Sequence, residues 1–182
     1  HQPMHVSDLF SKDFPTGNGG ATMSYVHDPV TESPIPLHIL WDSNALRVAS
    51  LAEVDRHTQE FVKNHPRSSF PELQAYPAGD PAAFEKWAKE SYQIAVDWAY
   101  KDVQTVPDPD MDADTEKLIR NMMAFILEGK APVEEAPPLP AGYWEKLQPT
   151  AERRITLAGY RIADLIISAA DSIEAQRKFV GR

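Results

Sequence analysis

The sequence predicts a mainly α-helical fold with a short β-hairpin in its N-terminal third. Apolar residues recur at helical spacing in several segments after residue 37, and helix-starting and helix-ending residues flank these segments. β-Forming residues with partial alternation occur in one short stretch, residues 21–27. With 182 residues, 42% of them hydrophobic and 25% charged, the chain can form a hydrophobic core, so we predict a single helical domain over residues 1–182.

The N-terminal third is expected to contain loops, a hairpin and one helix. Residues 7–20 are a polar loop whose glycines permit positive φ and close backbone approach. Residues 21–27 are predicted to form a short strand or half of a hairpin, and residues 29–36 a proline-rich turn. A helix is predicted over residues 38–49, with Leu40 and Trp41 packing inward.

Two helices in the middle of the chain have clear start signals. Ser50-Leu51-Ala52-Glu53 has the form of a capping box that opens a helix to about Asn64. Its expected apolar set is Leu51, Val54, Phe61 and Val62. Asp80 as the cap and Pro81 in the first turn begin the clearest helix. Its recurring apolar residues predict one long buried aromatic face: Phe84, Trp87, Ala88, Tyr92, Ala95, Trp98 and Ala99.

Two linkers separate the last two helices. Residues 107–114 are rich in Asp but lack the Gly and closing Glu of a calcium-binding EF-hand loop, which indicates an acidic linker. A helix over residues 113–128 should stop at Gly129 and bury Leu118, Ile119, Met122, Met123 and Ile126. Residues 131–140 are predicted to be extended and exposed.

The last helix is predicted from near Gly142 to about Ala175, with a kink or a new start at Pro149. The apolar positions expected to be buried are Ile155, Ala158, Ile162, Leu165, Ile166 and Ala169. Three arginines are expected on its other faces: Arg153, Arg154 and Arg161.

His38 and Asp42 are the strongest candidates for metal ligands. Residues four apart on a helix lie on one face, so an imidazole and a carboxylate would point at the same place. Zinc binds His nitrogen and Asp oxygen at about 2.0–2.2 Å, and catalytic zinc has roughly three protein ligands. His5 would complete such a set. Pro3 breaks any helix that arrives from upstream, so the His5 side chain can turn toward the other two donors.

The same residues also admit an ordinary interpretation. A His and an Asp four apart on a helix are usually a surface pair, and His5 alone would usually be a satisfied histidine. His27, beside Asp28-Pro29, is expected to be a solvated turn residue rather than a fourth ligand, and His57 and His65 are expected to be surface histidines.

Composition restricts the classes of partner. The formal net charge of -9 argues against a protein that reads nucleic acid through a basic groove, although metal ions can hold phosphate in an acidic protein. Because the chain has no cysteine, a zinc site must use its six histidines and its carboxylates. No signal peptide and no apolar run of about 20 residues is present, so no membrane partner is expected.

The motifs together resemble a known family. His-Gln-Pro-Met-His-Val, a Gly-Gly turn and Leu-His-x-x-Trp-Asp resemble the zinc-dependent single-strand-specific nucleases, the class I nuclease and 3'-nucleotidase family of the phospholipase C-like fold. Residues 151–163 are similar to that family's last helix. The resemblance implies a secreted or periplasmic hydrolase with three zinc ions, which cleaves single-stranded RNA and DNA to 5'-phosphorylated products and often acts as a 3'-nucleotidase.

By this resemblance, His5, His38 and Asp42 bind one zinc near the short hairpin, and His1 is not assigned because the family varies there. The nucleophile would be a metal-bound water, and no catalytic side chain is assigned. The remaining ligands would precede the His-Gln-Pro segment, so only the C-terminal portion of a larger catalytic domain would be present. We therefore expect residues 1–182 alone to be inactive. Besides single-stranded nucleic acid or nucleotides, the expected partner is the missing N-terminal segment, in the same or an associated chain.

One departure from the family and two alternative functions remain. Ala21 follows the Gly-Gly turn where the family commonly has Asn. A zinc phospholipase C of the same fold would hydrolyse phosphatidylcholine rather than single-stranded RNA. A non-catalytic helical binding module would contain no zinc, and chelation would not change its thermal stability.

Overall fold

The computed structural model describes residues 1–44, 50–75, 80–111 and 115–180. These ranges contain six α-helices and a small three-stranded sheet, which confirms the predicted mainly α-helical class with a short hairpin. The helices are α1 (Leu37–Asn44), α2 (Leu51–Asn64), α3 (Glu72–Ala75), α4 (Ala82–Ile94), α5 (Thr115–Glu128) and α6 (Tyr143–Val180). None of the helices in these ranges is both long and apolar enough to cross a membrane.

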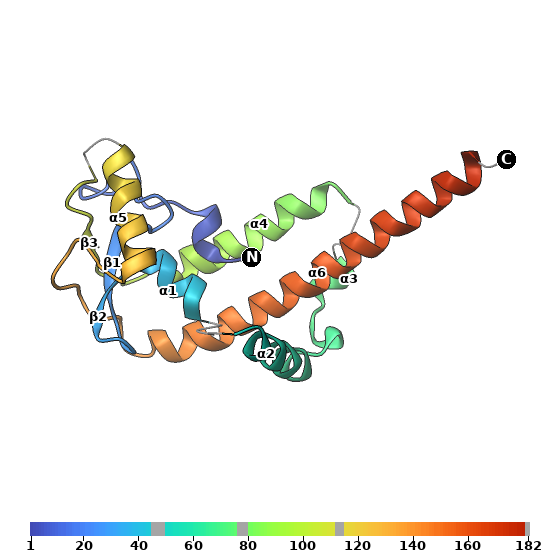
Figure 1. Cartoon of the computed structure of the whole chain (residues 1–182), viewed down its shortest axis with the longest axis horizontal. Coiled ribbons are helices and arrows are strands. Elements are labelled where there is room, and N and C mark those ends of the chain that lie inside the picture. The colour runs from blue at the N-terminus through green and yellow to red at the C-terminus, as the bar shows by residue number, and fades with distance from the viewer. Residues whose placement is uncertain (45–49, 76–79, 112–114, 181–182) are drawn as a thin grey trace.

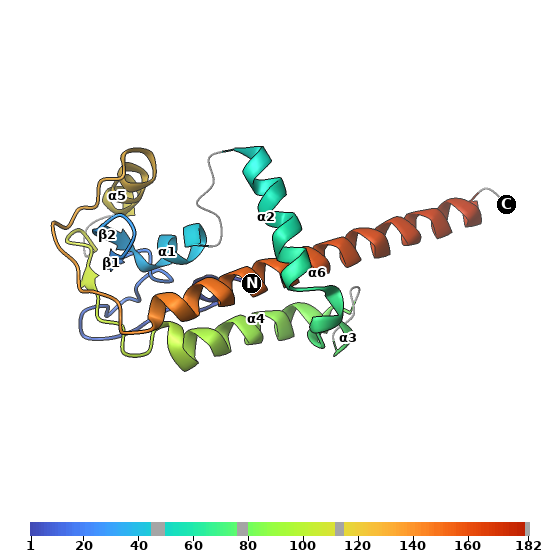
Figure 2. The same cartoon turned by 90° about the horizontal axis from the view of Figure 1, so that it is seen from below.

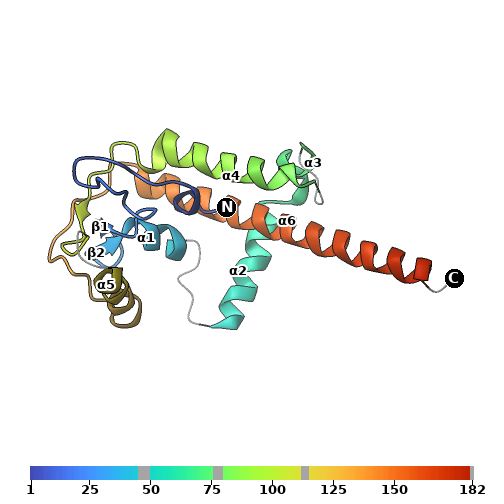
Figure 3. The same cartoon turned by 90° about the horizontal axis from the view of Figure 1, so that it is seen from above.

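The long helix α6 organises the molecule (Figure 1). Helix α4 runs beside the N-terminal half of α6, and α2 crosses α6 on another side (Figures 2 and 3). The sheet, α1 and α5 gather at one end, while the C-terminal half of α6 extends away from the body (Figure 1). A short 3-10 turn, η1 (Pro3–Val6), packs on α4, so the N-terminal motif lies against this helix.

The hairpin consists of β1 (Ser24–Asp28) and β2 (Ser33–Pro36), and a short β3 (Val106–Pro107) pairs with the other side of β1. Tyr25 lies opposite Pro36, and Val26 opposite Ile35. The prediction of a turn over residues 29–36 is therefore wrong for its second half. Prolines are tolerated there because β2 is an edge strand, whose open side needs no ladder hydrogen bond from the N–H that proline lacks.

The main core joins α1 and the sheet to the first turns of α6. Leu40 and Trp41 are buried, as predicted, together with Val26 and Leu147. The Trp41 Nε1 donates to the Tyr143 hydroxyl at 3.0 Å, and this hydroxyl donates to the Ala99 carbonyl at 2.8 Å. A buried indole N–H is thus satisfied, and α1 is held against α6.

The start signals of α2 and α4 are confirmed. The Ser50 Oγ accepts from the Glu53 backbone N–H at 3.3 Å, and the Asp80 Oδ1 accepts from the Ala82 N–H at 2.9 Å. The predicted apolar set of α2 is wrong in part, since Phe61 is buried whereas Leu51 and Val62 are exposed. Residues 45–49 of the predicted first helix lie outside the described residues.

The predicted long aromatic face of α4 is also wrong in part. Phe84 and Tyr92 are exposed, and the buried row is Ala83, Trp87, Ser91, Ala95 and Ala99, of which the last two lie in a π-helical turn after Ile94. The row that contains Phe84, Ala88 and Tyr92 is adjacent to the buried row, and aromatic periodicity alone cannot choose between adjacent rows.

Helix α5 is more exposed than predicted, and the linker after it is less exposed than predicted. Of the five residues expected inside α5, Ile119, Met123 and Ile126 are exposed. Residues 131–140 are partly buried rather than exposed. The Pro137 carbonyl accepts from the His27 N–H at 2.8 Å, so this linker satisfies the side of β1 that β3 is too short to cover.

Helix α6 continues through Pro149 to Val180, five residues beyond the predicted end. Its buried face is not the predicted one: Ile155, Ile162 and Ile166 are exposed, whereas Arg154 and Arg161 are buried. The two guanidinium groups bind the Glu90 carboxylate of α4, at 3.0 Å and 2.7 Å. The face with arginines packs together with Leu147 and Leu157, and Glu90 of α4 supplies the charge that the two buried guanidinium groups need.

Candidate metal centre

His5, His38 and Asp42 converge at the junction of η1 and α1. Each offers one ligand atom, and the three atoms lie within 4.8 Å of one another, the one such group of His, Cys, Asp or Glu in the described part of the chain. The turn η1 presents His5, while the first turns of α1 carry His38 and Asp42 on one face. The helical spacing thus places two side chains, and the N-terminal turn brings the third.

Each imidazole lies near one of the two Asp42 oxygens, at a distance close to that between two ligands of one ion. The Asp42 Oδ2 lies 3.3 Å from the His38 Nε2, and the Asp42 Oδ1 lies 3.6 Å from the His5 Nε2. Tetrahedral ligands at about 2.0–2.2 Å from zinc lie about 3.3–3.6 Å apart. The two imidazole rings are stacked, with centroids 4.9 Å apart and an interplanar angle of 18°.

A backbone carbonyl orients the His38 ring. The His38 Nδ1 lies 2.7 Å from the Gly20 carbonyl oxygen, which can only accept a hydrogen bond, so Nδ1 carries the proton. The lone pair is then on Nε2, the atom that faces Asp42. Metal-binding histidines are commonly oriented by such a hydrogen bond from the second ring nitrogen.

The Gly-Gly turn can approach His38 because Gly20 has no side chain. Gly20 has φ +61°, and a Cβ at this position would lie 2.5 Å from the Met4 carbonyl oxygen of η1. The sequence predicts a close approach between backbone segments in this loop, and the structure has it between Gly20 and Met4. The next residue, Ala21, has φ 69° and is fully buried, a conformation that Asn tolerates better than Ala.

Asp8 and Asn18 hold this turn in place, a role that the sequence analysis missed. The buried Asn18 Oδ1 accepts from the Leu9 N–H at 3.1 Å and the Ala21 N–H at 3.0 Å. The Asp8 Oδ1 accepts from the Asn18 N–H at 2.7 Å and the Gly20 N–H at 3.3 Å. The presence of Asp8 and Asn18 in a glycine-rich loop could have indicated this role, since Asp and Asn side chains commonly bind nearby backbone groups.

Replacing Gly20 with alanine is expected to lower the free energy of unfolding by more than about 2 kcal/mol, because the left-handed conformation alone costs about 1–2 kcal/mol and the contact with Met4 adds to it. Urea denaturation measures the change. Gly142→Ala is the matched control, because Gly142 has φ +75° and nothing within 4 Å of its Cβ position. Equal losses for the two variants would show that the close approach to Met4 contributes nothing.

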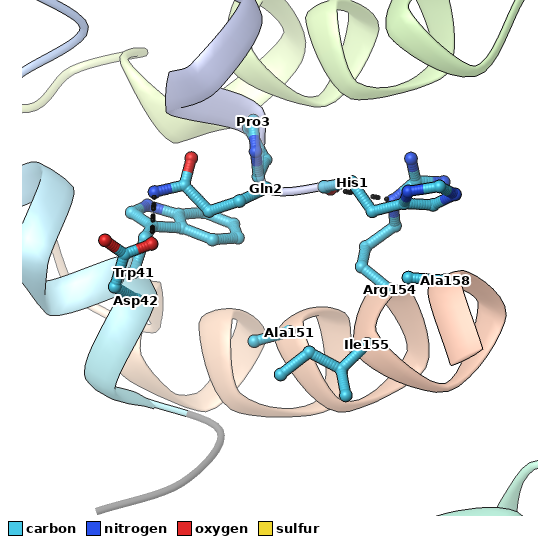
Figure 4. Close-up of a pocket in the computed structure, with 9 residues that line it drawn as sticks. All are labelled: His1, Gln2, Pro3, Trp41, Asp42, Ala151, Arg154, Ile155 and Ala158. Atoms are coloured by element: carbon cyan, nitrogen blue, oxygen red, sulfur yellow. Dashed lines mark hydrogen bonds between the residues drawn. The ribbon is translucent and has the colours of Figure 1, made fainter. Parts of the chain in front are cut away.

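The donor set fits zinc. Two imidazole nitrogens and one carboxylate oxygen are typical zinc ligands, and three protein ligands leave a coordination position for water or substrate. The His5 and Asp42 side chains are about half exposed, so this position is open to solvent. Asp42 also lines a pocket of about 220 Å³ that extends toward Arg154, as Figure 4 shows.

The family of the chain follows from its sequence pattern as a whole. A family model described as S1/P1 Nuclease matches residues 1–171, a range that includes the converging side chains and most of α6. The chain belongs to the S1/P1 nuclease family. No curated protein and no solved structure matches the chain.

Membership in the S1/P1 family confirms the resemblance and indicates a hydrolase that acts on phosphodiester bonds. It also agrees with a mainly α-helical, phospholipase C-like fold. The nuclease family therefore accounts for the motifs better than a phospholipase or a non-catalytic helical module.

His38 and Asp42 shift each other's pKa toward the charged form. Burial acts to lower the pKa of His38, but the hydrogen bonds to Asp42 and Gly20 and the charge of Asp42 outweigh it, so this pKa is raised. Burial acts to raise the pKa of Asp42, but hydrogen bonds from His38 and Gln2 and the nearby imidazoles lower it. Because the ligand form of His38 is the neutral imidazole, protons compete with a metal ion for its Nε2 as the pH falls.

The other histidines lie elsewhere. His27 is within β1 and half-buried, which corrects the expectation of a solvated turn residue. His57 lies 3.5 Å from Glu60, and His65 lies 3.3 Å from Glu152. The His1 Nε2 accepts a hydrogen bond from the Arg161 Nη1 at 2.7 Å, so it is engaged away from the centre.

Proposed function

We propose that this S1/P1 family member is part of a secreted or periplasmic zinc-dependent nuclease that hydrolyses single-stranded RNA and DNA to 5'-phosphorylated products and removes 3'-phosphates from nucleotides. The convergence of His5, His38 and Asp42 carries the proposal, because these donors have the chemistry and spacing of one zinc site. The family supplies the phosphodiester substrate class, and its members are largely secreted.

The roles of the chain's own residues follow from the geometry. His5 and His38 would donate nitrogen and Asp42 oxygen to the ion. The Gly20 carbonyl keeps the His38 Nδ1 protonated and thus keeps Nε2 available. When bound, zinc would supply Lewis acidity toward a phosphate oxygen and acidify a water molecule. Because the net charge is -9, we expect attraction of the phosphate to depend on metal rather than on a basic groove.

We propose that residues 1–182 do not act alone. One converging group of three donors is present in the described residues, whereas a cluster of three zinc ions needs several more. We propose that the other donors come from polypeptide outside residues 1–182, and that these residues by themselves bind one zinc and are inactive.

An assay on the natural gene product that contains these residues tests the function. We expect zinc-dependent hydrolysis of a single-stranded RNA oligonucleotide, its loss on chelation and its recovery with zinc, and no release of phosphocholine from phosphatidylcholine. Phosphatidylcholine hydrolysis without RNA hydrolysis would favour the phospholipase instead. Residues 1–182 alone should contain about one zinc per chain by elemental analysis and should leave the RNA intact. RNA cleavage by this polypeptide alone would contradict the proposed need for outside donors.

A further inference from the structure

Gln2 contacts all three residues of the candidate metal centre. Its Nε2 donates to the Asp42 Oδ1 at 3.0 Å and lies 3.4 Å from the His38 carbonyl oxygen. Its Oε1 accepts from the His5 backbone N–H at 3.1 Å and so caps η1. Figure 4 shows the amide extended from η1 to the carboxylate on α1.

The two ends of the Gln2 amide suit these contacts. Its carbonyl oxygen can only accept, as the contact with the His5 backbone N–H requires, and its NH₂ group can only donate, as the contact with the Asp42 carboxylate requires. The contact to Asp42 spans 40 positions in the sequence, so it fixes the turn η1 relative to the helix α1. It also fixes the Asp42 Oδ1, which lies 3.6 Å from the His5 Nε2, while Oδ2 faces the His38 Nε2.

We infer that Gln2 is a positioning residue of the metal centre: its amide holds the Asp42 carboxylate facing the two imidazoles, and it holds the turn that presents His5. This inference rests on the proposed zinc site. It assigns to Gln2 no contact with zinc or substrate. Hydrogen-bond partners of metal ligands generally set the orientation of those ligands, and losing such a partner typically weakens metal binding about 10–100-fold.

Two substitutions separate the two ends of the Gln2 amide. Gln2→Met has a similar length but loses both contacts. Gln2→Ser retains a hydroxyl that can cap η1 but is too short to reach Asp42. Gln93→Met is the matched control, because the Gln93 Nε2 donates to the Asp97 Oδ1 at 2.7 Å on the exposed surface of α4, in a pair of the same type.

The measurement is the zinc affinity of residues 1–182 in competition with a chromophoric chelator. We expect Gln2→Met and Gln2→Ser to weaken zinc binding about 10–100-fold and Gln93→Met to leave it unchanged. With cobalt in place of zinc, the visible absorption spectrum should change in both Gln2 variants, because a freed carboxylate alters the coordination. Thermal unfolding without metal shows that each variant is folded.

The outcomes distinguish this inference from the proposed function. If the unmodified chain fails to bind zinc, the proposed zinc site is wrong. If it binds zinc and both Gln2 variants bind as tightly with unchanged cobalt spectra, only the role of Gln2 is wrong. If Gln2→Ser alone retains full affinity, Gln2 acts as a cap of η1 and does not orient Asp42, which overturns the inference.

Discussion

Replacing His38 with alanine is expected to weaken zinc binding by more than about 100-fold, because even the loss of a hydrogen-bond partner outside the ligand set costs about 10–100-fold. His38 is the least exposed of the three donors and the one whose ring is oriented by a backbone carbonyl. Its loss leaves His5 and Asp42, which are both about half exposed and thus less constrained. Competition with a chromophoric chelator measures the affinity.

His57→Ala is the control for this substitution. His57 is also a partly buried helical histidine beside a carboxylate, since its Nδ1 lies 3.5 Å from Glu60, but it takes no part in the cluster. We expect its removal to leave zinc binding unchanged. Similar affinities for the two variants would mean that zinc binds elsewhere on the chain and that the assignment of His38 is wrong.

The parts of the centre that the sequence predicts are those determined by local geometry. The four-residue spacing of His38 and Asp42 needs only a helix to bring the two side chains together, and the structure has that helix. The caps at Ser50 and Asp80 are likewise contacts between neighbours in the sequence. His5 is proposed as the third donor from its chemistry and then from the family resemblance, because no local rule relates residues so far apart.

The features that the sequence analysis missed depend on distant partners. Asn18 lies in a loop that composition describes only as polar, yet its side chain is fully buried and also binds the Ser24 hydroxyl at 2.9 Å. The strand β2 contains two prolines, and its pairing becomes apparent only with β1 beside it. A buried Asn and a strand with two prolines are both unfavourable by themselves, and each is stabilised by a partner in the folded chain.

The buried face of α6 is the clearest case. Ile155, Ile162 and Ile166 form the more apolar stripe, but the stripe that carries Arg154 and Arg161 is buried. Both arginines bind Glu90, which is 64 positions before Arg154 and 71 before Arg161. A pattern confined to one helix contains no information about a carboxylate on another helix.

Replacing Glu90 with alanine is therefore expected to lower the free energy of unfolding by about 3–5 kcal/mol, because removing one partner of a buried ion pair leaves uncompensated charge inside the protein. Arg161 is 2% exposed and Arg154 6% exposed, so two guanidinium groups would lose their counter-charge. Urea denaturation measures the loss. Glu85→Ala on the same helix is the control, because Glu85 and Lys89 form an exposed pair at 2.6 Å and the substitution should have little effect.

The pH dependence of stability gives an independent test of the same cluster. Burial acts to raise the pKa of Glu90, but hydrogen bonds from Arg161 and Arg154 and their charges outweigh it and lower this pKa. A carboxyl group whose pKa is lower in the folded state stabilises the fold at pH values above its unfolded pKa, which is about 4.3 for Glu. This contribution should be lost as the pH falls through the folded pKa. This loss of stability at low pH should be absent in Glu90→Gln. The variant retains the shape of the side chain and a carbonyl acceptor, so it can be used even if Glu90→Ala fails to fold.

The same substitution should also weaken zinc binding, although Glu90 is not a ligand. The Arg154 Nε donates to the His1 carbonyl at 3.2 Å, and the Arg161 Nη1 donates to the His1 Nε2 at 2.7 Å, so the two arginines that Glu90 fixes also hold the residue before Gln2. Freeing these arginines should loosen η1 and with it His5. A lower zinc affinity in Glu90→Gln but not in Glu85→Gln would link the packing of α4 on α6 to the metal centre. Equal zinc affinities in the two variants would show that Glu90 does not contribute to holding η1.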